Sequence, residues 1–340
     1  TQLQESLQTV IERINFDRVE RKLYSHDIAA MPGMVKPLLG PVMSDAVAQP
    51  QTETELIQLV QWANQHQVPL TPRGKASSGY GGVLPIKNGV VVDFYFLKSV
   101  LKLDHAAQTV TVQPGITWEQ LDRYLQSQGL TLRLYPSSYP SSTVGGWLAQ
   151  GGAGFGSFEY GYFRQNVVSA RVVLPNGEVR PFSGAELDLI SDAEGITGLI
   201  SEVTLRVQPN FPVDLVSLGV KDALSFQKLI EALIAAQVPL WSMMFINPKM
   251  AELKNQAPLQ EHWGHTVGHK VELPSSYILT LAFRQKDRPA VDAALPAILS
   301  ATQAQILSDE IAHHEWDFRF KLMLVKRLGP SLVPSEVVVP

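Results

Sequence analysis

The 340-residue sequence contains no cysteine. Disulfides, a thiolate nucleophile and cysteine-ligated zinc or iron–sulfur centres are therefore excluded within it. It also has no apolar run long enough for a membrane span, and its opening TQLQESLQTVIERI lacks the apolar core of a signal peptide. These absences predict a cytoplasmic protein without a transmembrane segment.

An excess of positive charge is also missing. The 28 Lys and Arg residues are outnumbered by 32 Asp and Glu residues, which gives a net charge of −4. A nucleic-acid-binding face needs clustered basic residues, so we expect no nucleic-acid partner. The 45% hydrophobic content is that of a globular chain, long enough for one large domain or two medium ones.

Hydrophobic periodicity and turn residues predict alternating helices and strands as far as Pro209. We expect a helix over 52–67, with a capping box between Thr52 and Glu55. A second helix is expected from Thr117, with a capping box between Thr117 and Gln120. Asn176-Gly177 predicts a hairpin turn. The predicted strands are 68–71, 89–94, 110–112, 167–174, 178–181 and 199–207.

After Pro212 the pattern changes to strand, helix, two strands, helix and strand. This β-α-β-β-α-β order is typical of a ferredoxin-like sheet. We expect a polar loop between 248 and 274 and a domain boundary at 209–212, which gives domains 1–211 and 212–340. The predicted elements are 213–220, 222–236, 239–247, 277–284, 288–301 and 304–307.

Eleven of the 24 glycines lie in two windows, Pro72–Pro85 and Ser142–Gly161. Glycine lets backbone N–H groups approach a diphosphate closely, and neighbouring serine and threonine hydroxyls add donors. A P-loop is excluded because Tyr80 follows Gly79, and a dinucleotide fingerprint is excluded because position 157 is serine. The alternative is that the windows are flexible loops, but ordered elements flank both and favour an anion site.

Three motifs in order carry a family resemblance. PLTPRGKASSGYGGVLP resembles the first flavin loop of the vanillyl-alcohol oxidase/p-cresol methylhydroxylase (PCMH-type) superfamily, although Ala76 replaces that motif's second glycine. STVGGWLAQGGAGFGSFEYGYF is similar to its second loop, and EGITGLISEVTLRVQP to its closing motif. The nearest branch is the glycolate oxidase/D-lactate dehydrogenase group.

The resemblance implies an α+β fold, with an FAD-binding domain of two α+β subdomains and a ferredoxin-like cap that is incomplete at its C-terminal end. It implies noncovalent FAD, since none of the eight histidines lies in either loop. The implied cofactor-binding residues are Pro72, Arg73, Gly74, Lys75, Ala76, Ser77, Ser78, Gly79, Gly81, Gly82, Pro136, Ser142, Thr143, Gly145, Gly146, Gly151, Gly152, Gly154, Gly156, Tyr160, Gly161, Gly195 and Ile200.

The resemblance also implies oxidation of a small alcohol or 2-hydroxy acid by hydride transfer to flavin N5, with oxygen, a quinone or a protein as electron acceptor. Trp316-Asp-Phe-Arg319 fits the branch's substrate-side pattern, and Glu336–Pro340 fits the strand that follows. Arg319 is the candidate for a substrate carboxylate. The equally supported alternative is an ion pair between Arg319 and Glu315.

Two further functions stay open. The chain is also consistent with a noncatalytic flavin-bearing subunit that relays electrons in a multi-chain complex, or with an enzyme similar to UDP-N-acetylenolpyruvoylglucosamine reductase. His262, His265 and His269 have a spacing that a metal site could use, but Gly264 and Gly268 favour a loop. We therefore predict no metal.

Overall fold

The computed structural model describes residues 2–28, 37, 42–262, 265–267 and 269–329. The chain forms two compact units, described separately below: unit 1 is Thr1–Ala153 with Tyr162–Asn210, and unit 2 is Gly154–Gly161 with Phe211–Pro340. The main division thus falls between residues 210 and 211. Residues 154–161, which we placed with the first domain, group with unit 2.

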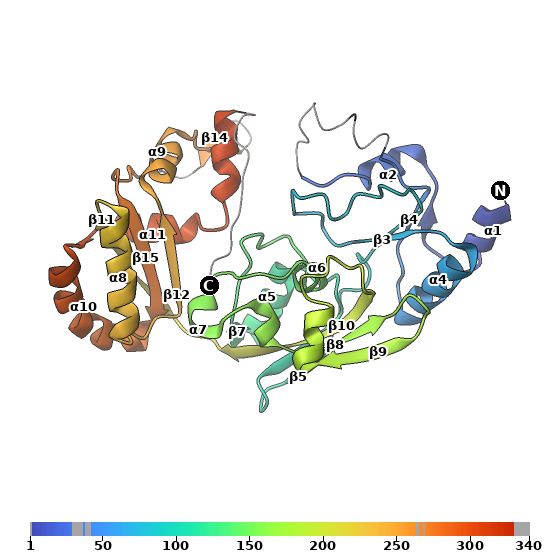
Figure 1. Cartoon of the computed structure of the whole chain (residues 1–340), viewed down its shortest axis with the longest axis horizontal. Helices are drawn as coiled ribbons and strands as arrows, with labels where there is room; N and C mark the ends of the chain where they lie inside the picture. Colours follow the sequence, from blue (N-terminus) through green and yellow to red (C-terminus); the bar gives the residue numbers. More distant parts are fainter. Residues whose placement is uncertain (1, 29–36, 38–41, 263–264, 268, 330–340) are drawn as a thin grey trace. The chain divides into compact units, whose positions relative to one another are not determined.

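The first half of unit 1 is a small sheet covered by a helix. Its strand order is β1 (Ile14–Asn15), β2 (Ala46–Ala48), β4 (Val90–Asp93) and β3 (Leu70–Arg73). β2, β4 and β3 run parallel, and α4 (Glu53–His66) connects β2 to β3 as the crossover helix (Figure 1). Leu56 and Leu59 of α4 are fully buried in the core shared with this sheet.

Helix α4 begins as predicted but with a different cap. The Thr52 hydroxyl accepts the Glu55 N–H at 3.1 Å. The Glu55 carboxylate, however, accepts the backbone N–H of Gln51 at 2.6 Å instead of that of Thr52. The predicted capping box is therefore wrong in its second half, and the strand predicted at 68–71 is displaced to β3.

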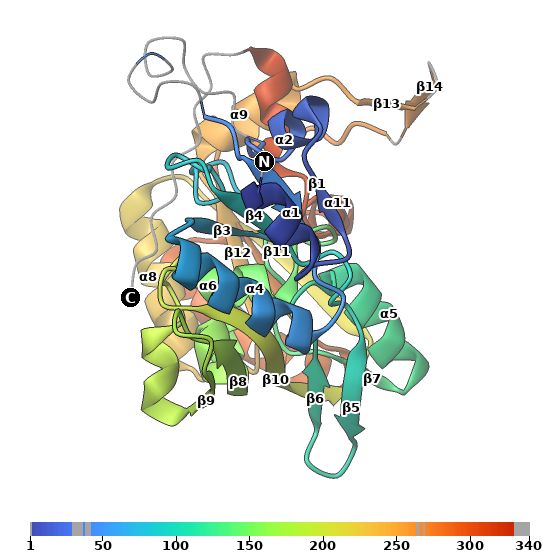
Figure 2. The same cartoon turned by 90° about the vertical axis from the view of Figure 1, so that its right-hand side faces the viewer.

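The second half of unit 1 is an antiparallel sheet, seen beside α4 in Figure 2. Its order is β5 (Val100–Asp104), β6 (Thr109–Val112), β10 (Leu199–Pro209), β8 (Val167–Val173) and β9 (Val179–Ser183), and β7 (Leu130–Leu132) also pairs with β10. The Asn176-Gly177 turn joins β8 to β9, which confirms the predicted hairpin. β5 and β7 were not predicted.

Two helices of this half position the site. α5 (Trp118–Ser127) has the predicted capping box, in which Thr117 and Gln120 each bond the other's backbone N–H. α6 (Val144–Gln150) begins at Thr143, whose hydroxyl accepts the Gly146 N–H at 3.2 Å. The shorter helices of unit 1 are α1 (Gln2–Gln8), α2 (Arg18–Leu23), η1 (Phe163–Asn166) and η2 (Gly184–Leu189).

Unit 2 has the ferredoxin-like sheet that the sequence predicts. The strands β12 (Ser242–Ile246), β15 (Tyr277–Arg284), β11 (Val213–Val220) and β16 (Gln305–Ile306) are antiparallel in that order. α8 (Ala223–Ala235) and α10 (Arg288–Thr302) cover one face, as Figure 1 shows at its left. Leu279, Leu281 and Phe283 alternate along β15 to bury their side chains against these helices.

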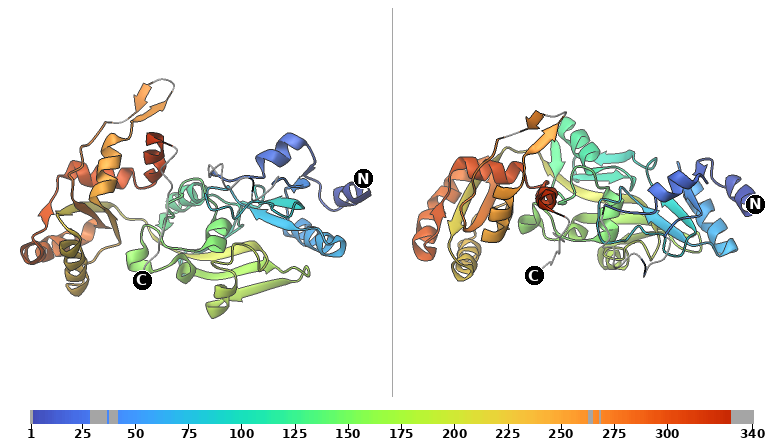
Figure 3. Two further views of the ribbon diagram at one scale, coloured as in Figure 1. Left: turned by 45° about the horizontal axis from the view of Figure 1, so that its top comes forward. Right: turned by 90° about the horizontal axis from the view of Figure 1, so that it is seen from above.

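The other face of this sheet carries α9 (Pro248–Gln256) and α11 (Asp309–Asp317), so the predicted polar loop is in part helical. The described remainder of that loop includes the hairpin β13 (Gln260–His262) and β14 (His265–Val267), visible in Figure 3. Unit 2 also holds α7 (Ser157–Tyr160), η3 (Gln285–Asp287) and η4 (Leu322–Leu328).

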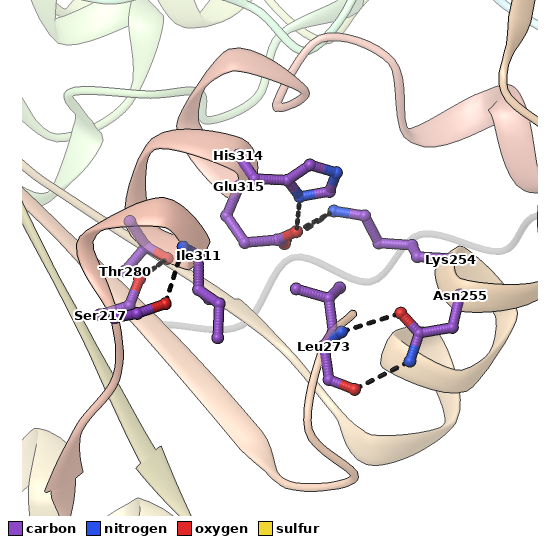
Figure 4. Close-up of polar contacts among 9 residues, drawn as sticks. Ser217, Lys254, Asn255, Leu273, Thr280, Ile311, His314 and Glu315 are labelled. Carbon is purple, nitrogen blue, oxygen red and sulfur yellow. Dashed lines mark hydrogen bonds and ion pairs between the residues drawn. The ribbon is translucent and has the colours of Figure 1, made fainter. Parts of the chain in front are cut away.

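A buried ion cluster joins α9 to α11 (Figure 4). Lys254 donates to both carboxylate oxygens of Glu315, at 2.5 and 2.7 Å, and the His314 ring nitrogen Nδ1 lies 3.0 Å from the same carboxylate. Glu315 is 1% exposed. Burial by itself raises the Glu315 pKa, but His314 and Lys254 outweigh it, so the pKa lies below its usual value.

None of the helices in the described part of the chain combines the length and apolar character that crossing a lipid bilayer requires.

Candidate functional site: a glycine-lined cavity in unit 1

A cavity of about 910 Å³, part of it open to solvent, lies in unit 1 between the two glycine-rich segments. It brings together 14 of the residues predicted to bind cofactor. These are Pro72, Arg73, Gly74, Lys75, Ala76, Ser77, Ser78, Gly82, Ser142, Thr143, Gly145, Gly146, Gly195 and Ile200.

The other predicted residues do not line this cavity. Gly154, Gly156, Tyr160, Gly161 and Arg319 belong to unit 2. Those in unit 1 that lie outside the lining are Gly79, Gly81, Pro136, Gly151 and Gly152.

The two glycine-rich segments touch at Gly74. A Cβ atom at Gly74 would lie 2.5 Å from the Thr143 hydroxyl oxygen, closer than real Cβ contacts occur. Only glycine therefore lets β3 end against the start of α6. The contact brings the backbone of both segments to one cavity, which is the cradle that a diphosphate group fits.

Ala76 occupies the position where the resembled motif has glycine. Its φ is +50° and its side chain is 7% exposed. This left-handed conformation is one that side chains with a Cβ disfavour. Ala76 thus holds, at the expense of local strain, a backbone conformation that glycine adopts freely.

Arg73 anchors the first loop to the chain that precedes it. Its guanidinium donates to the carbonyl oxygens of Tyr24 and His26, at 3.2 and 2.8 Å. Burial lowers the Arg73 pKa despite the nearby charge of Asp93. Asp93 in turn accepts the Tyr24 hydroxyl at 3.1 Å, and burial followed by that carboxylate raises the Tyr24 pKa to about 12.

A buried carboxylate on α5 holds the loop that carries Ser138 and Ser142, both of which line the cavity. Asp122, 4% exposed, accepts the hydroxyls of Tyr135 and Tyr139 at 2.9 and 3.3 Å. Burial raises the Asp122 pKa, and these hydrogen bonds oppose the rise. Ser138 donates to Ser142 at 2.7 Å, so the loop presents a fixed pair of hydroxyls.

Sequence reasoning missed several lining residues, notably Asp27, Ser138, Gln150 and Glu194. Asp27 accepts the backbone N–H of Gly81 at 2.8 Å, across 54 residues of sequence. No local pattern marks such a contact. Glu194 directly precedes Gly195, a predicted cofactor-binding residue of the closing motif. An acidic residue at that position was the signal in the sequence that could have identified it.

In unit 2, the predicted segment 154–161 is held by Arg284. The Arg284 guanidinium donates to Glu159 and to the Tyr160 hydroxyl, both at 2.9 Å. The backbone N–H of Glu159 also donates to the Trp241 carbonyl at 3.3 Å. The tail of the second glycine-rich window is thus ordered by unit 2.

Arg319 lies among aromatic rings of unit 2. Its guanidinium carbon is 4.0 Å from the Trp316 ring centre, 4.2 Å from Phe320 and 5.9 Å from Phe155. Glu315, its alternative partner, pairs with Lys254 and His314. The motif Glu336–Pro340 lies outside the described residues.

The histidine pattern at 262, 265 and 269 falls on the β13–β14 hairpin and its exit, not on a helix. His269 lies 3.4 Å from Glu310. Across the described ranges, no three His, Asp or Glu side chains gather as metal ligands would.

Comparison with known proteins agrees with this geometry. Residues 44–183 match the family described as FAD binding domain. The mitochondrial D-lactate dehydrogenase [cytochrome] of Arabidopsis thaliana is 38% identical over 173 residues, which is 48% of this chain and 30% of that protein. Glycolate oxidase subunit GlcD of Bacillus subtilis is 26% identical, over 96% of this chain and 70% of the relative.

Solved structures show the same fold. A structure of alkyldihydroxyacetonephosphate synthase superposes with a TM-score of 0.80 at 20% identity, covering 96% of this chain and 63% of that one. p-Cresol methylhydroxylase with substrate bound superposes with a TM-score of 0.72 at 15% identity, covering 94% and 68%.

Residues 44–183 thus match the FAD binding domain family, and the chain has the same α+β fold as the two solved structures. Its sequence relatives include glycolate oxidase and D-lactate dehydrogenase proteins. The predicted α+β fold is confirmed, and the FAD binding domain match agrees with the predicted family. The chain spans between 30% and 70% of the length of the two relatives described above.

Proposed function

We propose that unit 1 binds FAD noncovalently in its glycine-lined cavity and that unit 2 is the cap of an FAD-dependent oxidoreductase. The observation that carries the proposal is the convergence of both glycine-rich segments on one cavity within the FAD-binding family match. The backbone around Gly74 and Gly146, with the hydroxyls of Ser77, Ser142 and Thr143, would hold the diphosphate. The residues lining the described cavity include no histidine, cysteine or tyrosine that could form a tether.

We propose a small alcohol or 2-hydroxy acid as substrate, by analogy with the relatives' names. Bound FAD would supply a two-electron acceptor for the substrate hydride. The chain's own contribution is to fix the cofactor by backbone donors and hydroxyls and to bind the substrate anion. Electrons would then leave to oxygen, a quinone or a protein partner.

Arg319 is the proposed carboxylate-binding residue. A guanidinium offers two parallel N–H donors that match a carboxylate. The rings of Trp316 and Phe320 restrict its side chain, so it would be pre-oriented for such a ligand. Arg319→Lys would keep the charge but lose the bidentate geometry, and we expect it to raise the KM for a hydroxy acid more than it lowers kcat.

The test is an absorbance spectrum of the purified chain before and after acid precipitation, followed by anaerobic addition of glycolate or D-lactate. Flavin bands that move wholly to the supernatant would support noncovalent FAD, whereas bands that stay in the pellet would contradict it. Absence of flavin after incubation with FAD would overturn the proposal as a whole.

The anaerobic step separates the alternatives. Bleaching of the flavin by a hydroxy acid supports the oxidoreductase. A bound flavin that no hydroxy acid reduces, but that a redox partner does, indicates an electron-transfer subunit. Oxidation of NADPH by the holoprotein points to the reductase-like alternative.

A further inference from the structure

A second cavity, of about 570 Å³ and partly open to solvent, lies in unit 2 between α9, α11 and η4. Its described lining combines two kinds of side chain and contains no Asp or Glu. The basic lining residues are Lys254, Lys270, His314 and Lys321. The apolar ones are Ala257, Pro258, Leu259, Val271, Phe318, Leu322, Leu324 and Val325. In a chain with more acidic than basic residues, this lining is selectively cationic.

Hydrogen bonds hold the walls of this cavity in place. The Asn255 side chain of α9 donates to the Leu273 carbonyl at 2.8 Å and accepts the Leu273 N–H at 2.9 Å (Figure 4). The Arg327 guanidinium of η4 donates to the Leu259 carbonyl at 3.3 Å. The ion cluster described above joins α9 to α11. The three elements are therefore tied around the space by polar contacts as well as by apolar packing.

The Lys254 ammonium retains a donor for a ligand. Its side chain is 12% exposed, and two of its three N–H groups suffice for the two bonds to Glu315. Because Glu315 balances the charge of Lys254, this part of the lining supplies hydrogen bonding with little net charge. The positive charge that is left unbalanced must come from the other two lysines.

Lys270 and Lys321, called the rim lysines below, are both exposed. Within the described residues neither forms an ion pair, and Lys321 instead lies with its ammonium 4.9 Å from the centre of the Phe318 ring. Two ammonium groups without a counter-ion beside one cavity attract an anion.

The apolar part of the lining favours an aliphatic group. Phe318 is its one aromatic ring, and this ring already stacks on His314, with 4.6 Å between ring centres. The remaining apolar residues are aliphatic side chains of the segment after α9, of Val271 and of η4. They offer no planar surface on which an aromatic ligand could stack, whereas a flexible alkyl chain can pack among them.

We propose that the cavity of unit 2 binds an aliphatic carboxylate, with the alkyl chain against Val271, Leu322 and Leu324 and the carboxylate on the rim lysines. The site shares no lining residue with the glycine-lined cavity of unit 1, and Arg319 does not line it. The inference therefore goes beyond the proposed function and does not depend on FAD binding.

The test is isothermal titration calorimetry of the whole chain, in the presence of FAD, with octanoate, acetate and 1-octanol. We expect octanoate to bind at least about tenfold more tightly than acetate, which lacks the alkyl chain, and than 1-octanol, which lacks the charge. Excess glycolate should not displace octanoate, because a short hydroxy acid has no alkyl chain to bury.

The double variant Lys270→Gln with Lys321→Gln tests the rim lysines. It should weaken octanoate binding by about tenfold and leave 1-octanol binding unchanged. Lys249→Gln with Lys286→Gln is the matched control, since it removes the same charge from two exposed lysines of unit 2 outside the lining. The control should keep wild-type affinity for octanoate.

Four results would overturn the inference. They are the absence of saturable octanoate binding, equal affinities for octanoate and 1-octanol, and wild-type octanoate affinity in the rim-lysine variant. The fourth is displacement of octanoate by glycolate, which would place it at a hydroxy-acid site instead. A chain that binds octanoate as expected but no FAD would overturn the proposed function and leave this inference standing.

Discussion

At the scale of single residues, Ala76 connects backbone strain to the cofactor cavity. Changing Ala76 to glycine relieves the left-handed strain but removes a buried methyl group and loosens the unfolded chain, and these effects are of similar size. We therefore expect Ala76→Gly to change the free energy of unfolding by less than about 1 kcal/mol. Ala76→Val should lower it by about 2 kcal/mol, because a β-branched side chain tolerates this φ poorly.

Chemical denaturation of the two variants checks this asymmetry. Equal stabilities for the valine and glycine variants would show that the backbone at position 76 is not left-handed in solution.

Glu315 is the counter-ion of a largely buried lysine in unit 2. Glu315→Gln leaves the Lys254 ammonium, whose side chain is 12% exposed, without its counter-ion. We expect a loss of about 3 kcal/mol in the free energy of unfolding, measured by urea denaturation. The double change Glu315→Leu with Lys254→Met removes both charges and should lower the free energy of unfolding by clearly less. Equal losses would mean that the pair contributes through packing alone.

At the scale of elements, Glu53 at the start of α4 links the two sheets of unit 1. Its carboxylate binds the Arg171 guanidinium of β8 at 3.0 Å and the Ser201 hydroxyl of β10 at 2.6 Å. The hydrogen bond from Arg171 is the main cause that lowers the Glu53 pKa. Because the cavity lies between residues of both sheets, this link also bears on the cofactor site.

We expect Glu53→Gln to lower the free energy of unfolding by about 1 kcal/mol near neutral pH, since the pair is partly exposed. Because the Glu53 pKa is lower in the folded than in the unfolded chain, the ionised carboxylate stabilises the fold fully at pH values above the unfolded-state pKa. This contribution is lost as the pH falls through the folded-state pKa. The stability difference between wild type and Glu53→Gln should therefore shrink in acid, as measured by denaturation at several pH values. A constant difference across that range would exclude the ionised carboxylate as its cause.

At the scale of the whole molecule, the two units have separate hydrophobic cores, one around α4 and its sheet and one around α8 and α10. We therefore expect two unfolding transitions in scanning calorimetry. FAD at 100 times its dissociation constant should stabilise the unit 1 transition by about 2.7 kcal/mol and leave the other unchanged.

The same chain without added FAD provides the control, because the shift must vanish when no cofactor is bound. A single transition that FAD moves as a whole would show that the chain unfolds as one cooperative body.

The sequence by itself indicated many of the elements and the family resemblance. Periodicity, capping residues and the Asn176-Gly177 turn are local signals, because each acts through neighbours a few residues away. They placed α5, the β8–β9 hairpin and the ferredoxin-like order of unit 2. The glycine-rich windows likewise predicted an anion cradle, since glycine's close approach is a property of the residue itself.

Only the tertiary structure decided which distant side chains meet. Asp122 sits among polar neighbours on α5, and no pattern predicted its burial beneath Tyr135 and Tyr139. Glu55 accepts the N–H of Gln51 rather than that of Thr52, and Glu315 pairs with Lys254, 61 residues earlier in the chain. In the same way, the Glu194 carboxylate comes close to Gly82 only after more than a hundred intervening residues have folded.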